Sequence, residues 1–394
     1  MKLKTTCVLL FCAVFLWAGA GCVRADAEAE KGFGDIIVHT LVEVSGQRVE
    51  SIDVKLSEPL SGDVVSALKP EDFLMSGKAA GWMQPQPHAF EAPVAGLDVT
   101  DTLLTLYFED FPEKYFYVTD FTVECSAVPE LTFSKADITE ALTPVADDFE
   151  DGTFPETAYA YHLFTPAAHK ENTEASALPV VVVFHGYGDT DNLLTYRTSV
   201  EWAEAENQAV RPCYVLSPVI VNYSSVLERT QIYDAIYEML QEMMAAGKVD
   251  AERVYVMGNS FGGAATIEFL ERFPDFSAGA LILCPALNYF DASVFKNLSA
   301  ITEIPMWFCH AENDLTIASG TSRTAVEILE KNGAEDCHLT IYADEEMDAA
   351  GAVPSPEASV SYHHVEAAVM PDSTYAEWLF SCRLSGDTDA DGAE

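Results

Sequence analysis

One serine of the chain lies in a setting that favours nucleophilic chemistry. Ser260 is at the centre of Gly258–Gly262, which follows an apolar run typical of a strand and opens a segment typical of a helix. A serine on such a strained strand-to-helix turn brings its backbone close to its neighbours, so the residues two before and two after it must be small. Gly258 and Gly262 meet that requirement, and the helix start supplies free N–H groups beneath the serine. The pattern predicts a serine that attacks an acyl carbonyl.

A glycine-containing loop, His185–Asp189, directly follows the apolar run Pro179–Phe184. In enzymes with this kind of nucleophile turn, the loop after an early strand donates one backbone N–H to the oxyanion, and the residue after the nucleophile donates another. Tyr187 and Phe261 are the predicted donors, both through main chain. His185 precedes the serine, whereas the histidine of such a site follows it, so a structural role in the loop is predicted for His185.

A carboxylate is expected after a later strand. The strand-like run Ile304–Cys309 is followed by His310–Asp314, in which two acids, Glu312 and Asp314, compete. In sites of this class, His-Gly-like residues follow the strand and the acid lies about four residues further on, which selects Asp314 as the acid that orients the base. Glu312 is predicted to be a solvated loop residue.

The general base is expected last in the chain. His363 and His364 are the histidines beyond Asp314, apart from His338, which lies within a strand-like run. The order serine, acid, histidine is the one that this class of site requires. The residues therefore predict a triad of Ser260, Asp314 and either His363 or His364.

The elements that must position these residues follow an alternating pattern. Continuous apolar runs, as expected of strands buried on both faces of a parallel sheet, alternate with helical segments. The predicted strands are 179–184, 213–221, 253–257, 278–284, 304–309 and 338–343, and the predicted helices are 225–246, 263–273, 321–332 and 373–382. This alternation predicts a doubly wound α/β domain over 151–385 with a mostly parallel sheet.

The N-terminal part has a different pattern. Residues 34–126 contain short runs rich in β-branched and aromatic residues, at 35–44, 48–56, 102–108 and 115–125. Such spacing predicts a small antiparallel sandwich of immunoglobulin-like type. The proline-containing segment 82–93 is predicted to be an irregular loop, and 127–150 a linker that leads into the second domain.

The run from Pro179 to Phe380 resembles bacterial extracellular carboxylesterases of the α/β-hydrolase superfamily, the predicted-peptidase and polyhydroxybutyrate-depolymerase-like group. The resemblance rests on HGYGD at 185–189, on Trp202–Pro218, on VDAERVYVMGNSFGG at 249–263 and on WLF at 378–380. It implies an α/β-hydrolase fold, and members with an immunoglobulin-like N-terminal domain are known. In this group the histidine lies about fifteen residues before the Trp of the terminal helix, which implies His363. Glu366 stands where the group commonly has Trp, and His364 is the alternative base.

The expected function is hydrolysis of acyl esters through an acyl-enzyme intermediate, with a small ester or an esterified polysaccharide as substrate. Two alternatives are a serine peptidase of prolyl-oligopeptidase type and a catalytically inactive surface-binding protein. No cofactor and no metal is expected. Adjacent Cys and His, as at 309–310 and 337–338, point to opposite faces of a strand and do not converge on zinc.

The net charge and the two ends of the chain give further expectations about partners and location. The formal net charge is −42, which disfavours binding to nucleic acid. Residues 1–25 have the basic, apolar and small-residue regions of a secretory signal peptide, so an exported protein is expected. Cys22 lies in a lipobox-like context, which makes a lipid anchor an alternative to free secretion. Residues 386–394 are expected to form an acidic disordered tail, and the six cysteines beyond the leader to be free and buried.

Overall fold

The structure is a computed structural model that describes residues 32–44, 46–81, 85–171, 176–188, 192–289, 295, 297–352 and 362–384. The expected leader 1–25 with Cys22 and the expected tail 386–394 lie outside the described residues. Over the described ranges, no helix has both the length and the apolar character that a membrane crossing needs.

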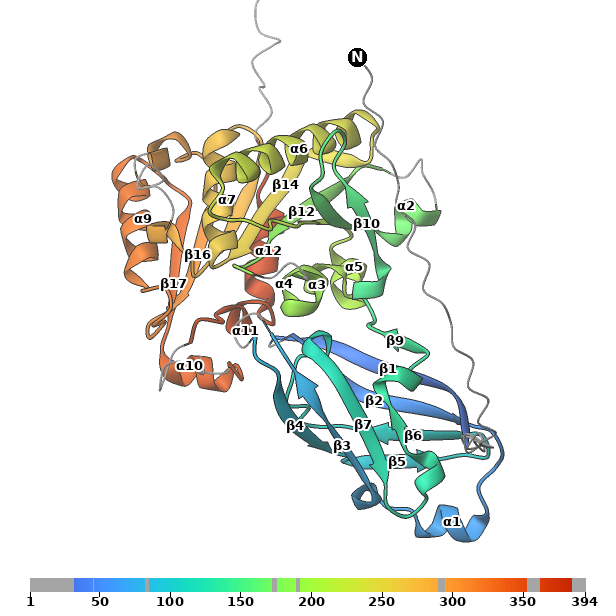
Figure 1. Cartoon of the computed structure of the whole chain (residues 1–394). Helices are drawn as coiled ribbons and strands as arrows, with labels where there is room; N and C mark the ends of the chain where they lie inside the picture. Colours follow the sequence, from blue (N-terminus) through green and yellow to red (C-terminus); the bar gives the residue numbers. More distant parts are fainter. Residues whose placement is uncertain are drawn as a thin grey trace, which may run out of the picture.

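An eight-stranded sheet forms the centre of the C-terminal part (Figure 1). Its order is β10 (Phe149–Thr153), β11 (Ala160–Phe164), β13 (Tyr214–Pro218), β12 (Leu178–Phe184), β14 (Val249–Asn259), β15 (Gly279–Leu283), β16 (Met306–Ala311) and β17 (Cys337–Tyr342). Strand β11 pairs antiparallel with both of its neighbours, and the pairs from β13 to β17 are parallel. The predicted large, mostly parallel sheet is therefore confirmed.

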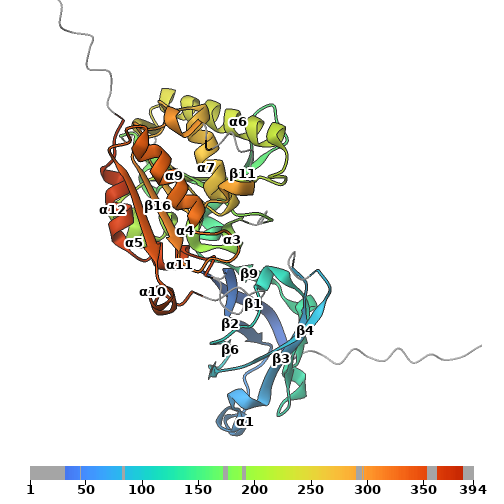
Figure 2. The same ribbon diagram turned by 90° about the vertical axis from the view of Figure 1, so that its left-hand side faces the viewer.

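Helices cover both faces of this sheet, as the two ribbon views show (Figures 1 and 2). One apolar core joins the sheet to α6 (Val226–Ala245), α7 (Phe261–Arg272) and α9 (Gly320–Lys331). The other joins the opposite face to α4 (Arg197–Ala203), α11 (Glu366–Val369) and α12 (Ser373–Ser381). Shorter helices are α2 (Ala167–Glu171), α3 (Asn192–Thr195), α5 (Ala205–Val210) and α10 (Asp344–Ala349). Because both faces are covered, the central strands are apolar along their length.

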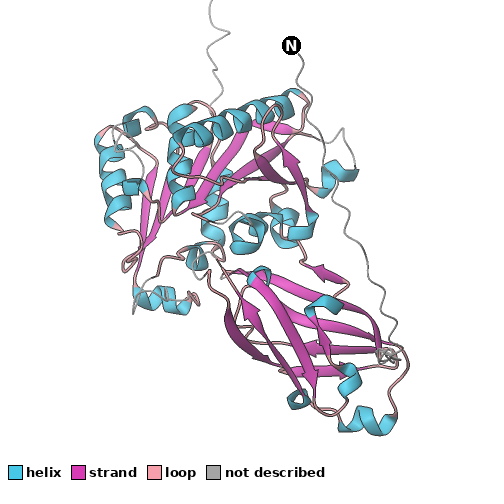
Figure 3. Cartoon of the chain, viewed as in Figure 1, coloured by secondary structure: helices cyan, strands magenta, loops and turns pink. Residues whose placement is uncertain are grey.

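The N-terminal part consists mainly of strands (Figure 3). Two sheets share one apolar core. The first has the order β5 (Gly96–Val99), β6 (Leu103–Tyr107), β2 (Gly46–Leu56), β1 (Phe33–Glu43) and β9 (Glu140–Leu142), and the second has β4 (His88–Pro93), β3 (Phe73–Ala79), β7 (Val118–Cys125) and β8 (Phe133–Ser134). One short helix, α1 (Gly62–Ala67), lies among these strands in the chain.

Three expectations for this part need correction. Strand β4 lies within 82–93, which was expected to be an irregular loop. The strand tolerates its terminal Pro93 because β4 is at the edge of its sheet, where a missing N–H leaves no ladder bond unmade. Strands β8 and β9 lie within 127–150, so the expected linker also completes both sheets, with β9 parallel to β1. The run 115–125 begins with a turn of 3₁₀ helix at Tyr115–Tyr117 before β7 starts.

Replacing Glu271 at the end of α7 with glutamine is expected to raise the melting temperature by about 2 °C near pH 8.5 and to change it little near pH 5. Burial, and then repulsion from Glu268, raises the pKa of Glu271 to about 8, against an opposing hydrogen bond from Asn297. The folded protein therefore favours the protonated acid. That contribution to stability is complete below about pH 4 and is lost as the pH rises toward about 8.

Thermal unfolding followed by circular dichroism at both pH values measures this effect. Glu242→Gln, on the exposed side of α6, is the matched control and should shift the melting temperature equally at the two pH values. A shift for Glu271→Gln that is the same at both pH values would contradict the prediction.

Candidate active site

Ser260 lies at the turn between β14 and α7 in a conformation that few residues adopt. Its φ is 57° and its ψ is −118°, which costs on the order of 1–3 kcal/mol. Hydrogen bonds hold the turn, because the Ser260 N–H donates to the Leu283 carbonyl at 2.9 Å and the Ser260 carbonyl accepts from the Ala286 N–H at 2.9 Å. A Cβ at Gly262 would lie 2.0 Å from the Phe184 carbonyl oxygen, and one at Gly258 would lie 2.4 Å from the Gly262 carbonyl oxygen. Both glycines are therefore steric requirements of the turn, as the sequence indicated.

His363 brings together the serine and the acid. Its Nδ1 is 2.7 Å from Asp314 Oδ2, and its Nε2 is 2.9 Å from Ser260 Oγ. Since an ionised carboxylate only accepts hydrogen bonds, Nδ1 carries the ring proton, and Nε2 is left as the acceptor for the serine hydroxyl. The imidazole is thus oriented to remove the Ser260 proton. The structure places Ser260, Asp314 and His363 in one hydrogen-bonded chain.

Asp314 is buried and surrounded by donors. Its Oδ1 accepts the N–H groups of Thr316 at 2.8 Å and Ile317 at 2.9 Å. Burial by itself raises the pKa of Asp314, but hydrogen bonds from His310 and His363 and the backbone N–H of Ile317 outweigh it and hold the pKa well below its usual range. The acid therefore stays ionised across the pH range in which it has to orient His363.

Glu312, the competing acid, lies away from this chain of hydrogen bonds. Its side chain is half exposed and pairs with Arg323. The strand-to-acid spacing that favoured Asp314 over Glu312 thus matches the arrangement of the two side chains.

His310 is a residue of the site that the sequence reasoning did not assign. Its ring is fully buried, with Nε2 2.8 Å from the Ile317 carbonyl oxygen and 3.2 Å from Asp314 Oδ2, and Nδ1 2.8 Å from Ser322 Oγ. Because the carbonyl can only accept, Nε2 carries a proton that is shared between Ile317 and Asp314. His310 therefore supports the acid from the side opposite His363. Its position four residues before Asp314 was the available signal.

Tyr187 and Phe261, the predicted oxyanion donors, lie against each other beside the nucleophile. Their ring centroids are 5.0 Å apart. Gly188, next to Tyr187, has a φ of 82°, which allows the loop to turn sharply. His185 has the structural surroundings expected for it, because its Nε2 accepts the Ile220 N–H at 2.9 Å and its carbonyl accepts the Tyr223 hydroxyl. Burial lowers the pKa of His185 to about 4, so the ring stays neutral.

His364, the alternative base, has Glu366 and Tyr196 as its partners in place of Ser260. Its Nδ1 is 2.9 Å from Glu366 Oε1, and its ring packs against the tilted ring of Tyr196, with the centroids 5.2 Å apart. Glu366 is 1% exposed, and its second oxygen has no hydrogen-bond partner among the described residues. Glu366 is thus a buried acid that holds His364.

Cys284 is a second residue near the triad that the sequence did not indicate. Its thiol donates to the His363 carbonyl at 3.2 Å, and its backbone has a φ of 36°. Within the described part of the chain, Cys284, Asp314 and His363 are the one group of metal-type ligands close enough to share an ion. Burial raises the pKa of the Cys284 thiol well above its usual value, which opposes the thiolate that a metal needs. Asp314 and His363 are engaged with each other. The six described cysteines are free, and all but the partly buried Cys337 are buried.

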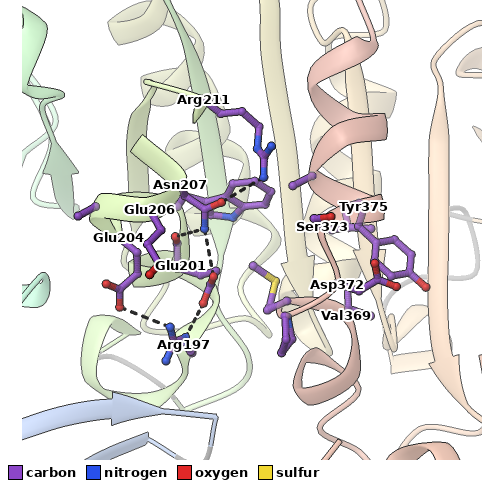
Figure 4. Close-up of a pocket in the computed structure, with 16 residues that line it drawn as sticks. Arg197, Glu201, Glu204, Glu206, Asn207, Arg211, Val369, Asp372, Ser373 and Tyr375 are labelled. Carbon is purple, nitrogen blue, oxygen red and sulfur yellow. Dashed lines mark hydrogen bonds and ion pairs between the residues drawn. The ribbon is translucent and has the colours of Figure 1, made fainter. Parts of the chain in front are cut away.

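A polar cavity of about 560 Å³ lies between α4 and α5 on one side and the start of α12 on the other (Figure 4). Its polar lining includes Arg197, Glu201, Glu204 and Asp372. None of the three triad side chains lines it. The cavity is therefore separate from the hydrogen-bonded chain at Ser260.

Comparisons with known proteins show what this chain is similar to. Residues 167–350 match the family model described as phospholipase/carboxylesterase. A search of curated proteins finds no match. A structure titled as a thermostable esterase is similar over 89% of this chain and 99% of its own, with 22% identity and a TM-score of 0.66. Est1E from Butyrivibrio proteoclasticus aligns with 59% of this chain and 99% of its own, at 12% identity and a TM-score of 0.42.

The matched segment contains Ser260 and Asp314, and the thermostable esterase shares the fold. An alignment over 89% of the chain is longer than the α/β part, so it extends into the N-terminal strands as well. The chain therefore shares the α/β fold of that esterase, and its residues 167–350 are similar to the phospholipase/carboxylesterase family.

Proposed function

We propose that this protein is a serine carboxylesterase that hydrolyses small esters through a covalent acyl-enzyme. The observation that carries the proposal is the continuous hydrogen-bonded chain from Ser260 Oγ through His363 to Asp314, at 2.9 Å and 2.7 Å. In this proposal Ser260 is the nucleophile, His363 the general base and Asp314 the acid that orients it. The backbone N–H groups of Phe261 and Tyr187 hold the oxyanion.

The reaction has two halves. His363 Nε2 takes the Ser260 proton as Oγ attacks the ester carbonyl, and the tetrahedral oxyanion is held by the two backbone N–H groups. The imidazolium, stabilised by ionised Asp314, then gives its proton to the alcohol as the ester C–O bond breaks. In the second half, water loses a proton to His363 and attacks the acyl-serine, and Ser260 recovers its proton as the acid product leaves.

An apolar rim beside the triad suits neutral ester groups. Tyr187 is 45% exposed, and Tyr289 and Leu315 are more exposed still. Tyr289 packs at 5.6 Å on Phe261, the neighbour of the nucleophile, and Leu315 follows Asp314 in the chain. Large exposed apolar side chains beside a catalytic serine provide contact area for acyl or alcohol groups. A small ester or an esterified polysaccharide would supply such groups.

Two alternatives differ from this proposal in what they would hydrolyse or label. The phospholipase/carboxylesterase description of the matched family favours an ester over the peptide bond of a prolyl-oligopeptidase-type enzyme. The oriented base argues against an inactive surface-binding protein. Export through residues 1–25, lipidation at Cys22 and the immunoglobulin-like nature of 34–126 stay predictions, as does the division that gives 151–385 to catalysis.

Labelling with a fluorophosphonate tests the proposed function without knowledge of the substrate. The probe reacts only with an activated serine, so a labelled peptide should carry the phosphonate on Ser260. The same preparation should hydrolyse p-nitrophenyl acetate or butyrate. Labelling without ester turnover, combined with cleavage of an acyl-prolyl peptide, would point to the peptidase. Absence of both labelling and turnover would point to the binding protein.

Asp314→Asn is expected to lower kcat by about 10⁴-fold, with KM changed little. The amide keeps the shape of the carboxylate, but it can donate to His363 Nδ1 and so favour the wrong tautomer, with the proton on Nε2. Glu312→Gln makes the same chemical change two residues away on an exposed side chain and should stay within about twofold of wild type. Steady-state kinetics on p-nitrophenyl butyrate give both values. Equal kcat values for the two variants would refute the assignment of Asp314.

A further inference from the structure

The N-terminal β domain contacts the catalytic domain next to the loop that carries His363. Strands β1 and β2 contact α3 and α4, and the ribbon views place these helices and α11 beside the strands (Figures 1 and 2). Val42 of β1 is buried in the apolar core on the α4 face of the catalytic sheet. At Gly46, φ is 102° and a Cβ would lie 2.8 Å from the Thr195 carbonyl oxygen. The two domains are thus in close contact at Thr195.

Lys114 of the β domain contacts two consecutive residues of the catalytic domain. Its Nζ donates to the Thr195 carbonyl at 3.2 Å and lies 4.7 Å from the centroid of the Tyr196 ring. An ammonium group at that distance over an aromatic face is attracted by the ring. The next residue, Arg197, is tied to Glu201 and Glu204 at the edge of the polar cavity, as the dashed lines in Figure 4 show. The backbone at Tyr196 is therefore held from both domains.

The ring of Tyr196 also contacts His364, on the loop that carries His363. It packs at a tilt against the His364 ring, with the centroids 5.2 Å apart, and His364 is hydrogen-bonded to Glu366 at 2.9 Å. Glu366 is buried, and one of its oxygens has no hydrogen-bond partner among the described residues. Loss of its hydrogen bond to His364 would therefore leave the whole buried carboxylate without a hydrogen-bond partner, which is costly. His364 is thus fixed on two sides, and it adjoins His363 in the chain.

We propose that Lys114 and Tyr196 are positioning residues for the catalytic base, acting through His364 on the loop that carries His363. The inference rests on the proposed role of His363. It gives the β domain a part in catalysis: by holding the Tyr196 ring in place, the domain keeps His363 Nε2 within hydrogen-bond distance of Ser260 Oγ. Small losses of alignment in such a pair are costly for the chemical step, while the binding of a small ester depends on other contacts.

The test compares Lys114→Met with Lys114→Arg in the full chain. Lys114→Met removes both contacts and is expected to lower kcat for p-nitrophenyl acetate by about threefold to tenfold with KM within about twofold. Lys114→Arg keeps a cation that reaches the ring and should restore kcat to within about twofold of wild type. Tyr196→Leu should lower kcat as Lys114→Met does, and Tyr196→Phe, which keeps the ring, should not.

Lys55→Met is the matched control, because Lys55 lies on the same domain and pairs with Asp35 at the surface. Active sites are counted by end-point fluorophosphonate titration, so that kcat refers to folded enzyme, and circular dichroism checks that each variant is folded. The inference is overturned if Lys114→Met and Tyr196→Leu keep the kcat of wild type, if they change only KM or the melting temperature, or if Lys55→Met lowers kcat equally. An inert wild-type protein would instead refute the proposed function.

Discussion

Ser260→Ala is expected to lower kcat for ester hydrolysis by about 10⁶-fold. Removal of Oγ eliminates the acyl-enzyme route, and the remaining rate comes from water attacking an ester held by the backbone N–H groups. The fold should survive, because the side chain makes one contact with His363 and the turn is held by backbone hydrogen bonds. Alanine also tolerates the φ of 57° no worse than serine does. The residual rate is measured from the release of p-nitrophenol from p-nitrophenyl butyrate at high protein concentration.

Asn259→Ala is a useful neighbour for comparison, because Asn259 is buried at the same turn but does not belong to the triad. It keeps Ser260 and its base, so fluorophosphonate labelling at Ser260 should persist. A Ser260→Ala protein that still turned over the ester at the wild-type rate would show that another group is the nucleophile, and the triad would have to be abandoned.

The sequence predicted the catalytic elements well because their signals are strong. Strands buried on both faces appear as uninterrupted apolar runs, and all six predicted runs of the α/β part correspond to strands. The steric requirement of the turn is also visible in the sequence, because a side chain at Gly258 or Gly262 would clash with neighbouring backbone. These signals are local, so they can be read without knowledge of the contacts.

What the sequence did not reveal depends on neighbours far along the chain. Strands β10 and β11 lie at the antiparallel edge of the large sheet, where exposed polar residues such as Asp151 hide the pattern. Strand β9 is three residues long and exists because β1 pairs with it. The role of Cys284 follows from its contact with His363, which no spacing in the sequence encodes. For His310, the spacing of four residues before Asp314 was a signal, but its contact with the acid is visible only in the structure.

The sequence left open which of two adjacent histidines is the base, and the contacts of their side chains distinguish them. His363 and His364 have almost the same position in the chain, but their side chains point to different partners. His363 contacts Ser260 and Asp314, whereas His364 contacts Glu366 and Tyr196. The backbone turns at this point, since the Val365 N–H donates to the His363 carbonyl at 3.0 Å.

His363→Ala is accordingly expected to lower kcat by about 10⁶-fold, nearly as much as the loss of Ser260, because a serine without its base is a poor nucleophile near neutral pH. His364→Ala removes only a positioning contact and should cost about tenfold or less. The double variant Ser260→Ala/His363→Ala should be no slower than either single variant, since residues that act as one unit are not additive in their effects. Kinetics on one ester under identical conditions, with folding checked by circular dichroism, give all four rates. A larger loss for His364→Ala than for His363→Ala would transfer the role of base to His364. It would also remove the basis for coupling Lys114 and Tyr196 to His363, since the residue they hold would itself be the base.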